Sequence, residues 1–398
     1  MNQIIRLDPL RRSRRFQDLA AGAAAAPGQR LQSRGSGPGQ RPPTRPPYSG
    51  GGKKDGKKDG GKKYYPLPRE VRSEDTLDWR QCSNLALAWQ RLLPYQEKWQ
   101  LAKEDLGPKI AALGNRLRED AFPEGKLIDN FLARQQELLA SLHTIPGLAV
   151  WTAKVKTQSR LSLGFGNTTP LETGLTLHRL YGLPYLPGSA LKGICRAWAL
   201  GTLAEKYHVP CLDRAEIDLL HGQKPKLPTP WEMLEDLLLT PPSSRQTWPE
   251  RLWRWQGRVR ELLPRWREAP FLQDHFELAP FWQDDQVGVF HRLFGSQDQR
   301  GRVCFYDAFP VSRGQMFDLD IINVHYQPYY GNPNKYHPAD YYSPVPNYFL
   351  TVAPGVAFQL FLTSPVPALA QTAGQWLTAG LHNLGLGAKT AIGYGILE

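Results

Sequence analysis

Apolar residues recur at two spacings along this chain, and the change between them predicts an α+β fold. Over residues 74–144 they fall at steps of three and four, as in amphipathic helices, with an interruption at Pro94. Over residues 148–158 they alternate with polar residues, which predicts a strand. We therefore expect a helical region at residues 64–146, followed by a main domain at 147–398 that contains a sheet.

The predicted first strand has one apolar and one basic face. Lys154 and Lys156 share a face with Val150, whereas Trp151 points to the other side. Arg160 follows shortly after the strand. These three basic residues are candidates for contact with a polyanion. The alternative is that they are solvated, as lysines at the exposed edges of sheets commonly are.

A helix is expected to begin near Ser189, which follows Pro187 and Gly188 and is a favourable N-cap residue. Lys192 and Arg196 lie four residues apart, on a face different from the apolar stripe. Free N–H groups at a helix start, together with adjoining basic side chains, can form a phosphate site. The alternative is an ordinary capped helix that carries two solvated basic residues.

The second half of the chain mixes further helices and strands. An insertion at about 208–288 is broken by prolines and rich in tryptophan, with helical pieces around 231–239 and 250–263. Another helix is expected over 368–384. Residues 326–348 form a tyrosine- and proline-rich excursion, which could stack RNA bases or pack on another subunit. Strands are expected at 302–309, 317–324, 356–362 and 392–397.

A glycine-rich loop precedes the last predicted strand. It has two Gly-x-Gly units separated by five residues, and a Lys-Thr pair lies between them. Glycine adopts positive φ readily and lets a phosphate or another backbone approach closely. Ala388 stands where a Walker A motif has glycine, so a nucleoside-triphosphate cradle is not expected. We expect this loop to approach a different phosphate-rich ligand. The alternative is a tight turn between a helix and a strand.

The positive charge of the chain is concentrated at one end. The formal net charge is +12, and residues 1–63 hold fifteen Lys/Arg against four Asp/Glu. Residues 64–398 hold thirty-four against thirty-three, so the rest of the chain is nearly neutral and a nucleic-acid surface there must be local. Residues 1–63 are expected to form a disordered basic tail, which could attract phosphates or act only as a solubilising arm.

Several classes of protein are not supported by the sequence. The four cysteines are far apart, and no Cys, His or carboxylate spacing is typical of a metal site, so we expect neither metal nor cofactor. No apolar run approaches the length of a membrane span and no secretory signal is visible. A cytoplasmic protein is expected.

The motifs resemble those of the RAMP superfamily of CRISPR proteins. The resemblance rests on Pro170–Gly174, on Gly182–Gly193 with Arg196 one turn later, on Phe294-Gly295 and on the Gly385–Gly395 loop. Within the superfamily, the set is most similar to the sixth-subunit family of Cmr (type III-B CRISPR) effector complexes. The resemblance implies a ferredoxin-like or RRM-type core over residues 147–398.

The resemblance also implies a function. Such a subunit would hold the 3′ part of the CRISPR RNA, would help the guide pair with target RNA, and would contact backbone and small subunits of the complex. Catalysis is not expected, because residues 145–212 contain no Asp where RNA-cutting relatives are expected to carry one. The candidate RNA contacts are Lys154, Lys156, Arg160, Ser189, Lys192, Arg196, Gly385, Gly387, Lys389, Thr390, Gly393 and Gly395.

Two other functions stay open at this point. One is a metal-independent endoribonuclease that processes CRISPR RNA with His178 as general acid or base. A lone histidine has no catalytic partner in the sequence, so the better interpretation of His178 is a loop residue that lies on the surface or is hydrogen-bonded to the backbone. The other is a scaffold subunit that binds only proteins.

Overall fold

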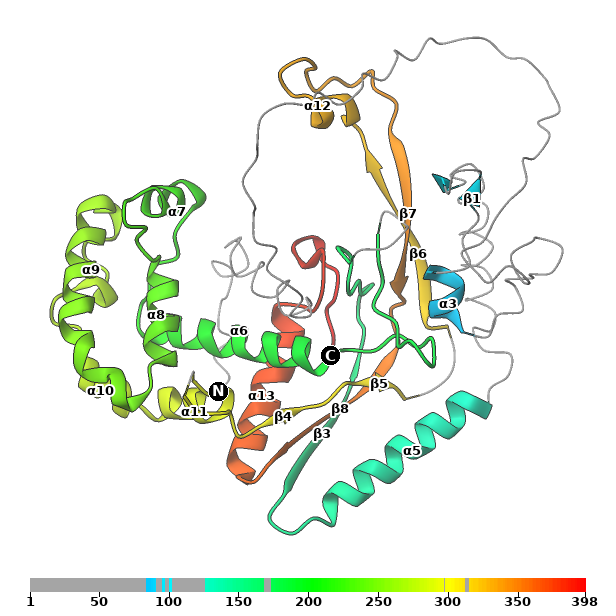
Figure 1. Cartoon of the computed structure of the whole chain (residues 1–398), viewed down its shortest axis with the longest axis horizontal. Helices are drawn as coiled ribbons and strands as arrows, with labels where there is room; N and C mark the ends of the chain where they lie inside the picture. The colour runs from blue at the N-terminus through cyan, green and yellow to red at the C-terminus, as the bar shows by residue number, and fades with distance from the viewer. Residues whose placement is uncertain are drawn as a thin grey trace, which may run out of the picture.

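The computed structural model of the chain describes residues 84–90, 95–96, 100–101, 126–167, 173–296, 298–311 and 315–398. In these ranges helices and antiparallel strands are mixed, as an α+β fold requires. Three parts are seen in Figure 1: a central sheet with helices, a lobe of helices beside it, and a long hairpin that projects from it.

The central sheet is built around β8. This strand (Ala357–Ser364) pairs antiparallel with β3 (Ala149–Lys156) along its whole length, from Ala149 opposite Ser364 to Lys156 opposite Ala357. On its other side it pairs with β4 (Cys304–Phe305) and β5 (Phe309–Pro310). A nearly continuous apolar run suits the central position of β8, because both of its faces are covered.

Two long helices, α6 (Gly188–Lys206) and α13 (Pro367–Asn383), pack on one face of the sheet. Gly374 of α13 lies directly against the indole of Trp151, and a Cβ at this position would overlap the ring. On the other face, α5 (Lys126–His143) places Leu139 and Leu142 on Phe361 of β8. The alternation predicted for the first strand is confirmed, since Trp151 and Lys154 lie on opposite faces.

The predicted insertion forms the lobe of helices. It is joined to the sheet domain through the C-terminal end of α6 (Figure 1). Capping boxes begin two of its helices, with Asp213 and Glu216 at α7 and Thr229 and Glu232 at α8. The helical pieces predicted around 231–239 and 250–263 are confirmed. The lobe comprises α7 (Arg214–His221), α8 (Pro230–Leu239), η4 (Pro242–Thr247), α9 (Trp248–Leu262), η5 (Pro264–Trp266), η6 (Pro270–Leu272), α10 (Leu278–Gln283) and α11 (Asp285–Phe294).

The projecting hairpin is made of β6 (Phe317–Val324) and β7 (Val345–Val352), with the short helix α12 (Gln327–Gly331) at its far end (Figure 1). Phe317 and Val352 are buried at its base. The predicted excursion at 326–348 is therefore mainly the tip of this hairpin. Strand β7 was not expected from the sequence, because Pro344 and Pro346 at its start suggest a loop.

Three other predictions differ from the structure. Leu101, expected in a helix, lies in the two-residue strand β2 (Gln100–Leu101), which pairs with β1 (Tyr95–Gln96). The preceding helix, α3 (Leu85–Gln90), ends before Pro94. The strand predicted at 302–309 is divided into β4 and β5. The strand predicted at 392–397 is replaced by η7 (Thr390–Ile392) and a single bridge between Thr157 and Leu397.

Two of the predicted regions fall wholly or largely outside the described residues. The predicted basic tail at residues 1–63, and much of the predicted helical region at 64–146, lie outside the described residues. Within the described ranges, no helix combines the length and apolar character that a membrane crossing needs.

Candidate nucleic-acid interface

Helix α6 begins at Gly188, directly after Pro187, so the prediction that Ser189 is its N-cap is wrong. Ser189 lies inside the first turn, where its side chain is exposed and makes no capping hydrogen bond. The cap comes instead from the short segment between β4 and β5, since the N–H of Gly188 donates to Oδ1 of Asp307 at 2.7 Å. A carboxylate at this position is favoured by the positive end of the helix dipole.

A cavity of about 280 Å³ opens beside the first turn of α6. Lys192 is half-buried in its wall, and burial lowers the pKa of this ammonium group, helped by the positive charges of Arg196 and Arg300. No carboxylate occurs among the described residues that line it. An anion in the cavity would therefore relieve repulsion between cations. The lining residues are Gly188, Ser189, Lys192, Arg300, Gly301, Val303, Cys304 and Phe305.

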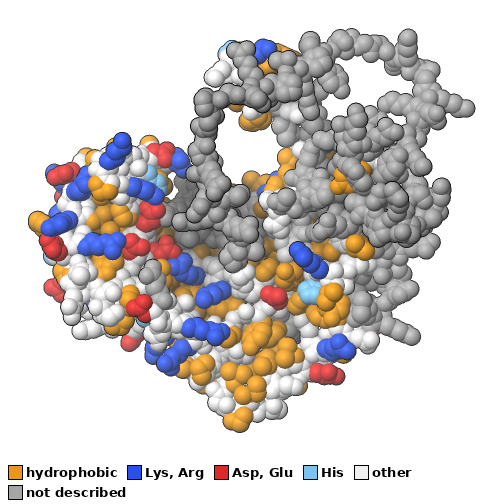
Figure 2. Space-filling view, in the orientation of Figure 1, with side chains coloured by type: hydrophobic (Ala, Val, Ile, Leu, Met, Phe, Trp, Pro, Cys, Tyr) orange, Lys and Arg blue, Asp and Glu red, His pale blue; other side chains and the backbone are white. Residues whose placement is uncertain are grey.

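Arg300 was missed by the sequence prediction, although a signal was present. The turn that carries it is closed by a bridge between Gly295 and Arg300, and Gly295 has φ = +83°. Gly295 and Gly301 thus bracket a tight turn with an arginine at its end. Figure 2 shows Lys and Arg side chains gathered over the region where α6, α11 and β4 meet.

Arg196 does not face the cavity as a free cation. Its Nη1 lies 2.6 Å from Oε1 of Glu235 in α8, and its guanidinium carbon lies 5.9 Å from the ring centre of Phe290. Both partners of the ion pair are largely covered. Arg196 therefore ties α6 to the lobe of helices.

The glycine-rich loop uses most of its glycines for packing. Gly387 and Gly395 are buried with φ of +91° and +75°, and a Cβ at either position would overlap a backbone carbonyl, that of Ser162 or Leu386. Leu386 N–H donates to the carbonyl of Gly395 at 2.8 Å. These contacts fit the alternative of a tight turn. Gly393, by contrast, is exposed and has open space around it.

Lys389 sits at the tip of this loop in the left-handed conformation, with φ = +64°. Its Nζ lies 5.2 Å from the ring centre of Phe349, 5.5 Å from that of Tyr394 and 5.7 Å from that of Phe165. Three aromatic faces therefore hold this ammonium group. Within the described ranges no carboxylate pairs with it, so its charge can still act on a bound anion.

Arg160 belongs to a network at the base of the hairpin. It bonds Asp318 at 2.7 Å and Asp320 at 3.3 Å, and the hydroxyl of Tyr394 donates to Asp320. The hydrogen bond to Asp318 raises the pKa of Arg160. Burial, followed by the hydrogen bond to Asp320, raises the pKa of Tyr394 to about 12. The network thus fixes the glycine-rich loop to β6, and Arg160 is engaged within the protein.

The other predicted contacts are separated from one another. Lys154 and Lys156 are exposed on β3, and Thr390 begins η7. The start of α6 contacts the segment around Asp307, whereas the glycine-rich loop contacts the segment from Arg160 onward. No contact among the described residues joins Lys192 to Lys389.

His178 is packed in a group of aromatic rings. It stacks on Tyr181 at 4.9 Å and lies 5.5 Å from Phe309 and 6.3 Å from Phe131 of α5. Its Nδ1 is buried without a hydrogen-bond partner, and burial lowers the pKa of the imidazole. These surroundings favour a packing role over acid–base chemistry.

The tip of the hairpin exposes several tyrosines. Tyr341 and Tyr342 lie with ring centres 4.6 Å apart, and Tyr326 donates a hydrogen bond to Asp340 at 3.1 Å. Tyr330 is two-thirds exposed, at 66%. Both RNA stacking and packing on another subunit fit this geometry.

The chain belongs to the RAMP superfamily, whose family model matches residues 154–398. Among characterised proteins, it is similar to CRISPR system Cmr subunit Cmr6 of Pyrococcus furiosus, with 35% identity over 271 residues. The match covers 66% of this chain and 69% of that protein. The superfamily membership that the motifs suggested is thereby confirmed.

Two solved structures are also similar. The crystal structure of Cmr6 from Pyrococcus furiosus is 30% identical, with a TM-score of 0.34, over 64% of this chain and 98% of that one. The cryo-EM structure of the type III-B Cmr-beta bound to cognate target RNA contains a chain that is 18% identical, with a TM-score of 0.43. That match covers 74% of this chain and 72% of the other.

Proposed function

We propose that this chain is an RNA-binding subunit of a type III-B CRISPR (Cmr) ribonucleoprotein, in which it takes the place of the sixth subunit. The relative named Cmr6, at 35% identity, supports this assignment. In this role the chain holds the 3′ part of the CRISPR RNA beside the backbone and small subunits. It has no catalytic step of its own, and it contributes to pairing of the guide with target RNA.

The core is proposed to be ferredoxin-like. Strand β3 is followed by α6, and β8 is followed by α13, so the two strand–helix units place both helices on one face of an antiparallel sheet. The C-terminal segment extends the sheet beside β3, because Glu398 N–H donates to Lys156 and Lys156 N–H donates back. The glycine-rich loop lies just before that segment.

The observation that carries the proposal is the cavity at the start of α6. Lys192 and Arg300 converge on it, and no acidic residue lines its described wall. Such a site fits a phosphate of the RNA backbone, which is recognised by charge and not by sequence. Base pairing between guide and target then supplies the sequence selectivity.

The other predicted RNA contacts differ in their roles in this proposal: some contact the RNA, and others orient or shape the parts that do. Lys389 and the exposed residues up to Gly393 offer a second contact to the RNA backbone, and Lys154 and Lys156 offer weaker ones on the strand. Arg160 and Arg196 act indirectly, because their ion pairs orient the glycine-rich loop and α6. Gly385, Gly387 and Gly395 shape the loop.

The test is a purification of the tagged full-length chain, coexpressed with its operon, followed by identification of bound RNA and proteins. Lys192→Glu combined with Arg300→Glu should reduce the recovered CRISPR RNA at least tenfold. The matched control combines Lys224→Glu with Arg258→Glu, two exposed basic residues of the lobe. Equal RNA recovery from the cavity variant and the wild type would refute the proposal.

A further inference from the structure

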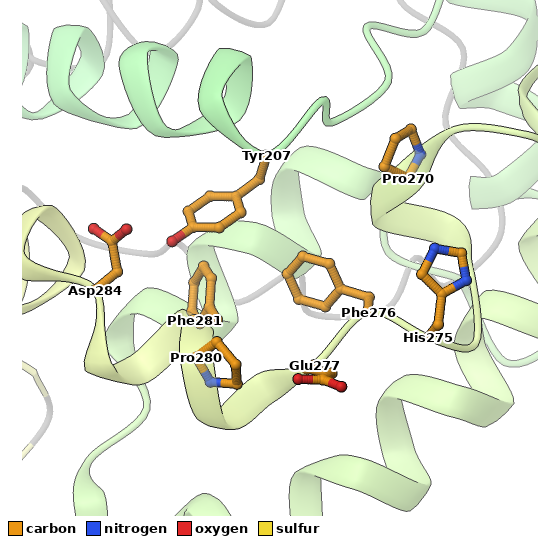
Figure 3. A pocket seen from close by; sticks show the side chains of 8 residues that line it. All are labelled: Tyr207, Pro270, His275, Phe276, Glu277, Pro280, Phe281 and Asp284. Carbon is orange, nitrogen blue, oxygen red and sulfur yellow. The ribbon is translucent and has the colours of Figure 1, made fainter.

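A second cavity lies in the lobe of helices, at the end of α6 opposite to the proposed RNA site. Its volume is about 410 Å³, and it opens between α10 and Tyr207, the residue that follows α6 (Figure 3). Nothing in the proposed function uses it. Aromatic rings, prolines and carboxylates share the wall, which consists of Tyr207, Pro270, His275, Phe276, Glu277, Pro280, Phe281 and Asp284.

Three aromatic rings form the floor of this cavity. The ring centre of Tyr207 lies 4.9 Å from that of Phe281 and 6.0 Å from that of Phe276. Figure 3 shows a carboxylate at each end of the group: Asp284 beside the Tyr207 hydroxyl, and Glu277 below Phe276. The cavity therefore combines π faces with negative charge.

A lysine outside the cavity contacts two of the residues at one end of it. Nζ of Lys206 forms an ion pair with Asp284 and lies 5.8 Å from the ring centre of Tyr207. A hydrogen bond from Tyr207 to Asp284 also contributes, after burial, to the raised pKa of the phenol. Asp284 and the ring of Tyr207 thus already interact with an ammonium group of the protein itself.

The other end has the same chemistry without a cation. Glu277 precedes the first turn of α10, but its side chain makes no capping hydrogen bond. It is exposed, and it forms no ion pair with any described residue. Phe276 beside it is only half-buried, so one part of its ring remains accessible at the cavity.

We propose that this end of the cavity binds an arginine side chain from a neighbouring protein subunit. The guanidinium would lie on Phe276 and pair with Glu277. Arginine is favoured over lysine because its planar group can stack on a ring and bond a carboxylate at once. An RNA phosphate would be repelled by the carboxylate of Glu277, which has no ion-pair partner among the described residues, so the occupant is a protein and not the guide.

The lobe uses the same pairing within its own structure. The guanidinium carbon of Arg251 lies 4.2 Å from the ring centre of Trp248, and that of Arg265 lies 4.8 Å from the ring centre of Trp266. In Figure 2 acidic and basic side chains are interspersed on the lobe, in contrast to the basic group near β4. This surface is therefore suited to a protein contact, and the site goes beyond the proposed RNA binding.

The chemistry of the site can be tested on the purified full-length chain with two small probes. N-acetyl-arginine amide should bind in ligand-observed NMR titrations, and its neutral isostere N-acetyl-citrulline amide should bind at least about threefold more weakly. Glu277→Gln and, separately, Phe276→Ala should each weaken binding of the arginine probe by a similar factor. Glu268→Gln, at an exposed carboxylate of the same lobe outside the cavity, is the matched control and should have no effect.

Three results of that titration would overturn the proposal. Equal binding of both probes would make the cavity merely apolar. Displacement of the arginine probe by cytidine or guanosine monophosphate would make it a nucleobase site. Binding that occurs only after the arginines of residues 1–63 are replaced by glutamine would identify this chain's own basic segment as the occupant.

The partner is tested in the assembled complex. Glu277→Lys should lower the recovery of at least one protein subunit severalfold at moderate salt, while the RNA bound by the chain itself is retained. The Lys192→Glu, Arg300→Glu variant should show the converse loss, of RNA. Failure of the two proposals is thus distinguishable. Wild-type recovery of every subunit with Glu277→Lys would contradict the proposed protein contact.

Discussion

Replacing both cations of the α6 cavity, with Lys192→Gln and Arg300→Gln, tests how the RNA backbone is held. Glutamine keeps much of each side chain's volume but removes its charge. Lys192 is half-buried and Arg300 is exposed at the cavity, and neither forms an ion pair with a described residue. The loss of binding should therefore come from the lost charges, with little change in folding.

The magnitude follows from counterion release. Each neutralised phosphate of a single strand contributes about −0.7 to the slope of log K against log salt concentration. Removing two contacts should make the slope less negative by about 1.4. Between about 50 and 200 mM salt, the ratio of wild-type to variant affinity should then shrink about sevenfold.

The assay is fluorescence anisotropy with a labelled single-stranded RNA at four or more salt concentrations. Arg196→Gln is the informative control, because Arg196 is paired with Glu235 and should leave the slope nearly unchanged. If the slope changed with Arg196→Gln and not with the cavity variant, the conclusion that Arg300, and not Arg196, contacts the RNA backbone would be refuted.

The remaining predictions concern stability. Gly395→Ala should lower the free energy of unfolding in urea by about 3 kcal/mol, because φ is positive and the new Cβ overlaps a backbone carbonyl. Gly393→Ala, where the space is open, should lower it by only about 1 kcal/mol, and equal losses would contradict this reasoning. A double-mutant cycle with Arg196→Gln and Glu235→Gln should give a coupling energy of about 1 kcal/mol, and a value near zero would show that the pair does not tie α6 to α8. Burial lowers the pKa of His178 below 6.5, so the neutral ring is favoured in the folded state. The stability that this gives is present above pH 6.5 and should be lost as the pH falls through the lowered pKa. In thermal melts, His178→Phe should lose less stability on the acid side than the wild type.

Helices and strands with strong periodic patterns could be predicted from the sequence. The first strand, α13 and the helical pieces of the insertion are recognisable because each buries a regular set of apolar positions. Strand β7 was missed because its first residues include Pro346 and are paired only with β6 at the edge of a hairpin. Local turn signals there outweighed the apolar residues that follow.

The candidate site shows where reasoning from the sequence stops. Lys192 could be proposed from its place on a helix near a turn. The partner of Arg196, however, lies in the inserted lobe, and the cap of α6 comes from Asp307, more than one hundred residues away. Whether a basic side chain is free or paired depends on such tertiary contacts. The same holds for Gly387, whose need for glycine arises from the carbonyl of Ser162.

The most direct test of RNA at the α6 cavity uses the thiol that lines it. Cys304 is exposed, and Nη2 of Arg300 lies 4.0 Å from its Sγ, whereas Cys195 is buried and serves as an internal reference. The rate at which a thiol reagent alkylates Cys304 in the purified chain is measured by mass spectrometry, with and without saturating CRISPR RNA. The proposed function predicts at least tenfold slower alkylation of Cys304 with RNA bound. An unchanged rate at saturation would contradict the placement of the RNA backbone in this cavity.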